Sequence, residues 1–232
     1  MIGIIGAMDI EIEAVQKRIE DPVFEDIAGC AFACGHIDGV MVAAARCNPG
    51  KVNAALCAQI MIDRFSADQI INVGVGCSLS PQVAIKNIVV ASDVCQYDID
   101  MTAIGEPRGF IDGLNMIKIP TDPDISERLA RIAINSGEKI HRGTVASGDI
   151  FIASKELKEK IVSEFSAICG EMEGGAIAHV AAANVNTPGC HAADHTMIAL
   201  TDMIVHILSF FQFFHFPFCI IGSAFLFAGA DG

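Results

Sequence analysis

Short runs of apolar and β-branched residues alternate along this chain with longer segments in which apolar residues recur every three or four positions. The short runs occupy residues 2–5, 40–45, 70–75, 88–91 and 143–146. The longer segments occupy residues 11–19, 50–65, 124–135, 155–165 and 173–183. The two spacings are those of buried strands and amphipathic helices. Their alternation predicts an α/β fold with a mostly parallel sheet covered by helices on both faces.

The charge balance limits the partners of such a fold. The chain has 232 residues, of which 52% are hydrophobic, so a disordered chain is excluded. Its 15 Lys and Arg against 28 Asp and Glu give a net charge of −13. This charge repels phosphate backbones and anionic lipid, so we expect a small-molecule partner and no nucleic acid.

The cysteines indicate a reducing compartment. There are nine, an odd number, with no CxxC pair among them. We expect reduced, mostly buried thiols and a cytoplasmic protein. The short apolar N-terminus has no preceding Lys or Arg and leads directly into Asp9, Glu11 and Glu13, unlike a signal peptide.

The C-terminal portion differs from the rest. Residues 203–229 contain no Asp, Glu, Lys or Arg and hold 8 of the 14 Phe. A stretch this long is formally a membrane-span candidate, but His206, His215 and Pro217 interrupt it and no basic residue flanks it. We expect a buried strand and helix there, or a terminus that packs poorly. Residues 1–232 are predicted to form one domain, with 187–232 its divergent, apolar portion.

Two acidic segments are candidates for chemistry. Asp9 and Glu11 follow the first predicted strand, at the sheet edge where ligands bind, so a general base is one interpretation and helix capping is the other. Glu171 and Glu173 precede two glycines at a helix start. At most one of them can face a given ligand, where its carboxylate would suit a vicinal diol such as ribose, and a solvated helix start is the alternative.

Other segments carry weaker signals. Residues 147–152 combine a Ser-Gly-Asp turn with Phe151, which could stack on a planar base. Residues 72–79 lack the third Gly of a dinucleotide fingerprint, so we expect no such cofactor. If they were helical, His191 and His195 would share one face as metal ligands do, but without a third ligand we expect a polar connector and no metal.

Six segments together resemble the 5'-methylthioadenosine/S-adenosylhomocysteine nucleosidases of the purine nucleoside phosphorylase superfamily. They are GIIGAMDIE (3–11), GKVNAA (50–55), INVG with SLSP (71–81), DIDMTAIG (98–105), VASGDIFI (145–152) and EMEGGAIAHVAAANVN (171–186). The resemblance covers about the first 186 residues. It implies a three-layer α/β/α fold with a central mixed, mostly parallel sheet, and a homodimer that needs no metal or organic cofactor.

The resemblance also implies an activity, the hydrolysis of the bond between adenine and a 5'-thio-substituted ribose in methionine salvage. Glu11 would activate the attacking water, and Glu173 would hold the ribose hydroxyls with Met172 packed against the sugar. Phe151 would stack on adenine, and the backbone of Ile152 would recognise the adenine edge.

The acid that protonates the leaving purine is where the chain departs from the family pattern. The family has an Asp that ends an Arg-Ala-Ile-Ser-Asp type segment. Residues 198–202 end in Asp202 but have Ile198 in place of the Arg, and residues 216–222 keep a Pro-Phe turn without the acid. We take Asp202 as the candidate catalytic acid.

Further departures leave other functions open. The family's Gly-Ile-Gly-Lys turn reads Asn-Pro-Gly-Lys at residues 48–51, Cys77 and Ser78 stand in its Gly-rich turn, and Ile104 replaces a Phe near the dimer-shared pocket. One alternative is a nucleoside-binding relative with impaired catalysis. The other is a phosphorylase, which needs cations around phosphate, and Arg46, Lys51 and Arg142 show no evident convergence.

Overall fold

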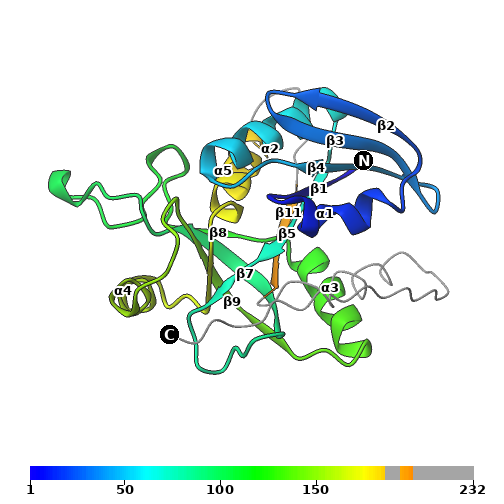
Figure 1. Ribbon diagram of the computed structural model, residues 1–232. Helices are drawn as coiled ribbons and strands as arrows, with labels where there is room; N and C mark the ends of the chain where they lie inside the picture. The colour runs from blue at the N-terminus through cyan, green and yellow to red at the C-terminus, as the bar shows by residue number, and fades with distance from the viewer. Residues whose placement is uncertain (186–193, 201–232) are drawn as a thin grey trace, which may run out of the picture.

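The computed structural model describes residues 1–185 and 194–200, with the backbone alone for the latter segment, as one mixed sheet with helices on both faces (Figure 1). The strands are β1 (Ile2–Gly6), β2 (Glu20–Ile27), β3 (Cys30–Ile37), β4 (Val40–Arg46), β5 (Gln69–Val75), β6 (Cys77–Ser78), β7 (Ile88–Gln96), β8 (Lys118–Pro120), β9 (Ile140–Ser147), β10 (Cys169–Glu171) and β11 (Asp194–Leu200). The helices are α1 (Asp9–Gln16), α2 (Lys51–Phe65), α3 (Pro123–Asn135), α4 (Lys155–Phe165) and α5 (Gly174–Val185), with short 3-10 turns at Thr102–Ile104 and Asp112–Leu114.

The strand order is β2-β3-β4-β1-β5-β11-β7-β9-β10-β6, with β8 paired to β7. β1 is parallel to β4 and β5, and β5 is parallel to β11. β11 runs antiparallel to β7, which starts a second parallel group with β9 and β10. The expected α/β fold with a mixed sheet is therefore confirmed, and its two parallel groups meet at the antiparallel pair of β11 and β7.

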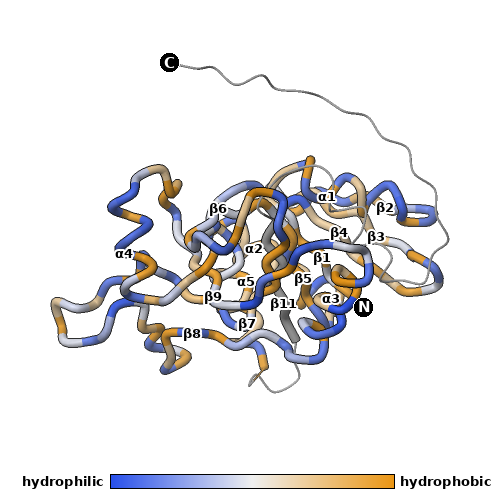
Figure 2. The backbone as a smooth tube through the Cα atoms, turned by 90° about the horizontal axis from the view of Figure 1, so that it is seen from below, coloured by the Kyte–Doolittle hydropathy of each residue, from blue (hydrophilic) through white to orange (hydrophobic). Residues whose placement is uncertain are grey.

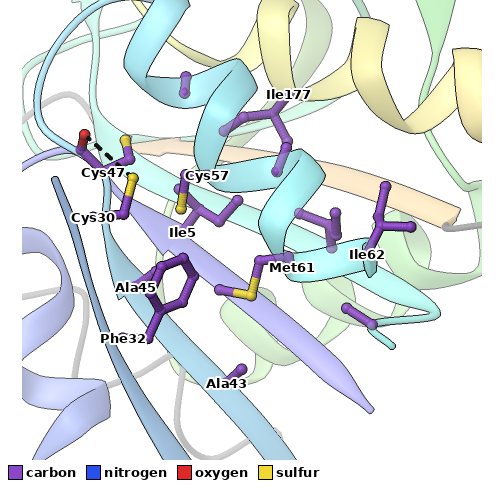
Figure 3. Close-up of a cluster of buried hydrophobic side chains, with 14 of the residues drawn as sticks. Ile5, Cys30, Phe32, Ala43, Ala45, Cys47, Cys57, Met61, Ile62 and Ile177 are labelled. Carbon is purple, nitrogen blue, oxygen red and sulfur yellow. Dashed lines mark hydrogen bonds between the residues drawn. The ribbon is translucent and has the colours of Figure 1, made fainter. Parts of the chain in front are cut away.

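Apolar residues on both faces of the central strands explain the layers. Ile4, Ile71 and Val73 face a cluster that α1 and α3 cover, whereas Ile5 and Ile70 face a cluster covered by α2 and α5. Figure 2 shows hydrophobic residues along the strands in the middle of the molecule. Figure 3 shows the second cluster, in which α2 packs over β1, β3 and β4.

Local sequence signals set several boundaries. Helix α3 begins after Asp122, whose Oδ1 accepts a hydrogen bond from the N–H of Ile125 at 2.6 Å, and Pro123 occupies the first turn. Helix α4 begins after Ser154, whose hydroxyl accepts from the N–H of Leu157. These caps satisfy backbone donors that a helix start leaves without partners.

The structure adds elements that the apolar pattern did not predict. β2 and β3 form an antiparallel hairpin at one edge of the sheet, and β7 continues to Gln96 beyond its apolar run. β2 alternates little and carries four acidic residues, so the pattern gave no strand there. Its pairing to β3 comes from the tight turn at Ala28 and Gly29, both with positive φ.

The structure tests the expectations for the C-terminal portion only at residues 194–200. His195 lies in strand β11, so the polar connector expected there is wrong for residues 194 and 195, and the helical condition for a metal pair with His191 is not met at His195. His191 lies outside the described residues, as does the apolar stretch 203–229. Within the part of the chain that the structure describes, no helix is long and apolar enough to cross a membrane.

Candidate active site

Glu11 is a buried carboxylate fixed by the backbone at the carboxyl ends of β1 and β5. It lies in the first turn of α1 and is 3% exposed. Its Oε2 accepts hydrogen bonds from the N–H groups of Ala7 and Met8 at 2.8 and 2.9 Å, and its Oε1 accepts from Val75 N–H at 2.9 Å. Burial raises the pKa of the Glu11 carboxyl, and these three N–H groups oppose the rise. The result is a fixed, poorly hydrated base.

Gly74 makes room for this carboxylate. A Cβ at residue 74 would lie 3.0 Å from Oε1 of Glu11. A side chain at this position would press on the carboxylate, so glycine is required by close approach.

Glu171 joins two strands to the start of α5. Glu171 of β10 is the register partner of Ser147 of β9, and the Ser147 hydroxyl donates a hydrogen bond to its Oε1. Its Oε2 accepts from the N–H groups of Glu173 and Gly174, both at 2.7 Å. Both oxygens thus have protein partners, and Glu171 orients the start of α5.

Glu173 has a freer carboxylate. It is 9% exposed, and its Oε1 accepts a hydrogen bond from Gly50 N–H at 2.7 Å. Burial, with the nearby charge of Glu171, raises the pKa of Glu173 to about 8. Of the two glutamates that flank Met172, Glu173 has the carboxylate less occupied by protein partners, since Glu171 accepts from Ser147, Glu173 and Gly174.

These carboxylates border one cavity of about 530 Å³. We call Glu11, Glu171 and Glu173 its acidic wall, and Cys77, Ile150, Phe151 and Ile152 its apolar wall. Met172 and Pro49 also line it. A volume of this size accommodates a nucleoside-sized ligand.

A second, much smaller cavity of about 10 Å³ borders all three residues of the acidic wall and Asn72. This volume is close to the smallest that holds one water molecule. The acidic wall therefore faces both a ligand-sized space and a water-sized one.

Residues 150–152 of the apolar wall follow β9, and Ile152 packs against Gly170 of β10. Phe151 is 79% exposed, whereas Ile152 is buried. A Cβ at Gly170 would lie 2.3 Å from Cδ1 of Ile152, so only glycine lets the two segments approach this closely. Cys77 Sγ lies 3.9 Å from the carbonyl oxygen of Ile152, which places the thiol beside the backbone of this wall.

Cations near the cavity are engaged by protein groups. No Lys or Arg of the described residues lines the cavity. Arg46 contacts Asp9 at 3.0 Å and Asn48 at 2.6 Å, and the ammonium of Lys51 lies 2.6 Å from Asp98.

The third expected cation, Arg142, pairs with Glu127 at 2.9 Å. Arg142 is not among the residues that line the cavity. Arg46, Lys51 and Arg142 therefore do not form a ready-made phosphate site.

The structure brings Glu11, Phe151, Ile152, Met172 and Glu173 together around this cavity. Asp202 lies outside the described residues, two positions after β11. Leu200, the last residue of β11, is the register partner of Val75, whose N–H binds Glu11. Strand β11 thus ends at the same end of the sheet as Glu11.

The sequence did not identify two residues that hold the glutamates of the acidic wall, Ser147 and Gly50. Ser147 was treated as part of a turn, although its hydroxyl binds Glu171, and Gly50 was noted only within a motif, although its N–H binds Glu173. Both contacts join segments far apart in the chain, so local pattern carries no signal for them. No group of three or more His, Cys, Asp or Glu suited to a metal occurs among residues 1–185.

Comparison with known proteins gives one consistent family. The model of the phosphorylase superfamily matches residues 1–193. The aminodeoxyfutalosine nucleosidase of Campylobacter jejuni is 34% identical over 179 residues, 77% of this chain and 78% of that protein. The 5'-methylthioadenosine/S-adenosylhomocysteine nucleosidase of Geobacillus thermodenitrificans is 34% identical over 180 residues, 77% of this chain and 76% of that protein.

A solved structure agrees with these relatives. The Helicobacter pylori 5'-methylthioadenosine/S-adenosylhomocysteine nucleosidase with butyl-thio-DADMe-Immucillin-A superposes with a TM-score of 0.79 at 30% identity, covering 92% of this chain and 90% of that one. The chain belongs to the phosphorylase superfamily, and within it to the nucleosidases related to 5'-methylthioadenosine/S-adenosylhomocysteine nucleosidase.

Proposed function

We propose that this protein is a nucleosidase that hydrolyses the N-glycosidic bond of 5'-methylthioadenosine and S-adenosylhomocysteine, releasing adenine and the 5'-thioribose. The observation that carries the proposal is the buried Glu11 carboxylate, held by three backbone N–H groups beside Glu173 in a nucleoside-sized cavity. The family relatives that carry this activity by name support it.

In the proposed reaction Glu11 removes a proton from water as the water oxygen bonds to C1' of the ribose. The C1'–N9 bond breaks, and its electron pair leaves with the purine while the sugar gains oxocarbenium character. A carboxylate with a raised pKa is a stronger base, which suits Glu11 to this step. Its negative charge also stabilises the positive charge that develops on the sugar.

Glu173 and Met172 hold the sugar in this proposal. The Glu173 oxygen not engaged by Gly50 can bond the ribose hydroxyls, and Met172 provides an apolar contact. Phe151 stacks on adenine, and the backbone of Ile152, whose carbonyl lies beside the Cys77 thiol, contacts the adenine edge. An exposed aromatic ring beside a cavity favours stacking on a planar base.

The departing purine needs a proton at N7, and we propose Asp202 as its donor. The end of β11 at Leu200, beside Val75 at the end of β5 and two residues before Asp202 in the sequence, supports this assignment. Replacement of Asp202 with Asn is expected to lower kcat by about 10²- to 10⁴-fold while the nucleoside still binds. An unchanged kcat would place the acid elsewhere.

Hydrolysis is preferred to phosphorolysis because a phosphate dianion needs convergent cations. Arg46 and Lys51 are each paired with a carboxylate, and the cavity is lined by three glutamates and by no Lys or Arg of the described residues. Adenosine phosphorolysis at this site would require rearrangement of both ion pairs.

Aminodeoxyfutalosine is the second candidate substrate. The Campylobacter jejuni aminodeoxyfutalosine nucleosidase matches this chain as well as the methylthioadenosine nucleosidases do, at 34% identity. A nucleosidase cleaves the bond between a base and its ribose, so the same wall residues would serve both reactions.

We further propose that the protein acts in methionine salvage in the cytoplasm as a homodimer formed by residues 1–232 as one domain. Ile104, which is 78% exposed, stands where the family has a Phe near the dimer-shared pocket. Analytical ultracentrifugation of the full chain tests the assembly, and a monomer at micromolar concentration would contradict it.

The substrate proposal is tested by incubating the purified chain with each of the three nucleosides and measuring adenine by chromatography. We expect adenine from 5'-methylthioadenosine and S-adenosylhomocysteine at comparable kcat/KM. Cleavage of aminodeoxyfutalosine alone would replace the first substrate assignment by the second. Binding of all three without adenine release would indicate a non-catalytic relative.

A further inference from the structure

Lys51, Asp98 and Asp149 form a closed ring of hydrogen bonds just outside the cavity. The ammonium of Lys51 donates to Oδ1 of Asp98 at 2.6 Å. The other carboxylate oxygen of Asp98 accepts from the backbone N–H of Asp149 at 2.9 Å, and Oδ1 of Asp149 accepts from the backbone N–H of Lys51 at 2.8 Å. We call these three residues the clasp. None of them lines the larger cavity.

The clasp connects three segments that are distant in sequence. Lys51 is the first residue of α2, Asp98 follows β7, and Asp149 belongs to the turn after β9. The side chains of Lys51 and Asp98 are 18% and 16% exposed, so their ion pair is largely shielded from water. Partly buried ion pairs with additional hydrogen bonds have a defined geometry, unlike exposed surface pairs.

Two residues of the clasp are sequence neighbours of residues that line or contact the walls of the cavity. Gly50 precedes Lys51, and its N–H binds Glu173 of the acidic wall. Asp149 precedes the apolar-wall residues 150–152. Gly50 has a φ of +102°, and a Cβ there would lie 3.2 Å from Oδ1 of Asp149, so the two turns are in close contact. The clasp therefore fixes the Gly50 turn relative to the residues that begin the apolar wall.

We propose that Lys51, Asp98 and Asp149 are positioning residues that set the separation between the ribose-holding Glu173 and the base-holding segment 150–152. This inference rests on the proposed function and deepens it. A nucleoside spans both walls, so it binds more tightly when the walls already have the correct separation. Binding then does not have to supply the free energy of ordering the two walls. A ligand that touches one wall only, such as adenine alone, gains nothing from the spacing.

The test compares a whole nucleoside with its base. Asp98→Asn keeps the side-chain shape but removes the charge that binds Lys51, and Lys51→Met removes the ammonium. In each variant we expect the Kd of 5'-methylthioadenosine, measured by calorimetry with Glu11→Gln added to prevent turnover, to rise about tenfold. The Kd of adenine should change less than about twofold, since a single-wall ligand does not depend on the spacing.

Control variants separate positioning from general damage. Asp100→Asn breaks the 2.6 Å ion pair of Asp100 with Arg108 in the same loop and should leave both affinities unchanged. Lys51→Arg keeps a cation that can reach Asp98 and should restore most of the nucleoside affinity. Equal losses for nucleoside and adenine, or no loss for either, would overturn the proposal.

A ligand-free measurement keeps the test independent of the substrate. Amide hydrogen exchange at Lys51 and Asp149 should be faster in Asp98→Asn than in the parent chain, because both N–H groups belong to the ring. Unchanged exchange at both amides would overturn the clasp. If the parent chain binds the nucleoside but releases no adenine, the proposed hydrolysis fails while the affinity ratio still decides the role of the clasp.

Discussion

The acidic wall and the apolar wall of the cavity are fixed in different ways. Each carboxylate of the acidic wall accepts a hydrogen bond from the backbone, and all three are buried. The donors include the N–H groups of Val75 for Glu11, Gly174 for Glu171 and Gly50 for Glu173. Phe151 of the apolar wall is 79% exposed. The preceding residue, Ile150, is held by the Tyr97 hydroxyl, which donates a hydrogen bond to its carbonyl oxygen at 2.6 Å.

The difference matches what each wall must do. Buried charges are costly unless they are hydrogen-bonded, so the acidic wall must be ordered before a ligand arrives. An exposed aromatic ring on a turn has no such desolvation cost, and its side chain can change orientation when a base binds. Within the acidic wall, Glu11 should therefore control the rate and Glu173 the binding of the ribose, whereas the apolar wall should control the affinity for the base.

Of the substitutions that test the contrast between the two walls, Glu11→Gln is expected to have the largest effect on activity. Loss of the general base should lower kcat by about 10²- to 10⁴-fold, while the Kd for 5'-methylthioadenosine changes little. Single-turnover adenine release and calorimetry measure the two quantities. Glu13→Gln, in which an exposed pair with Lys17 is lost, is the control. If Glu11→Gln retained full turnover, Glu11 would have no role as the base.

Glu11→Gln also has a structural consequence that needs a check. The Gln amide group would face one of the backbone N–H donors that Glu11 now accepts from, at a cost of about 1–3 kcal/mol in unfolding free energy. Thermal unfolding followed by circular dichroism shows whether the variant is folded under assay conditions.

The next effect concerns Glu173. We expect Glu173→Gln to weaken nucleoside binding by about 10- to 100-fold, because a charged or strongly polar partner of the ribose hydroxyls is lost. Adenine affinity should be unchanged, since the base does not depend on Glu173. Calorimetry with both ligands measures the contrast. Equal weakening of nucleoside and adenine would mean that Glu173 supports the whole cavity and not the ribose alone.

The pH dependence of stability tests the burial of the acidic wall. The pKa of Glu173 is about 8 in the folded chain against 4.5 for an ordinary Glu, so the folded state binds more protons between these values. The contribution of Glu173 to the unfolding free energy should therefore fall as pH rises from about 4.5 to about 8. Glu173→Gln lacks this pH-dependent contribution.

Urea unfolding of the parent chain and Glu173→Gln at pH 5, 7 and 9 measures this effect. The variant should gain about 1 kcal/mol or more relative to the parent between pH 5 and pH 9. A constant difference between the two chains across this range would show that Glu173 ionises normally in the folded state.

The smallest effect is expected at the apolar wall. Phe151→Ala should raise KM for 5'-methylthioadenosine by about 2- to 10-fold, the range expected for one aromatic contact, with kcat little changed. Because the ring is exposed, the melting temperature should not move. Phe24→Ala, at a similarly exposed ring on β2, is the control. A large fall in kcat for Phe151→Ala would contradict the division of roles between the two walls.

The sequence predicted well the parts of the fold that local pattern determines. Helix α4 occupies residues 155–165 as predicted, because its apolar spacing and its Ser154 cap agree. β2 was not predicted, since it is an edge strand with polar residues whose pairing depends on the hairpin turn. Edge strands carry a weak pattern because only one side of them is paired and packed.

The same division applies to the site. Glu11 could be proposed from its position after the first strand, since the ends of parallel strands form a common edge. Ser147, Gly50 and the clasp could not, because each acts through a contact across the fold to a residue about 24 to 123 positions away. Asp202 stays a prediction, as it lies outside the described residues.

The most direct test of the account is adenine release from 5'-methylthioadenosine by the purified full chain, first in phosphate-free buffer and then with phosphate added. Water as the nucleophile predicts full release without phosphate, no rate increase when phosphate is added, and free 5-methylthioribose as the second product. Release that requires phosphate and yields the sugar 1-phosphate would contradict the central role of Glu11 and water.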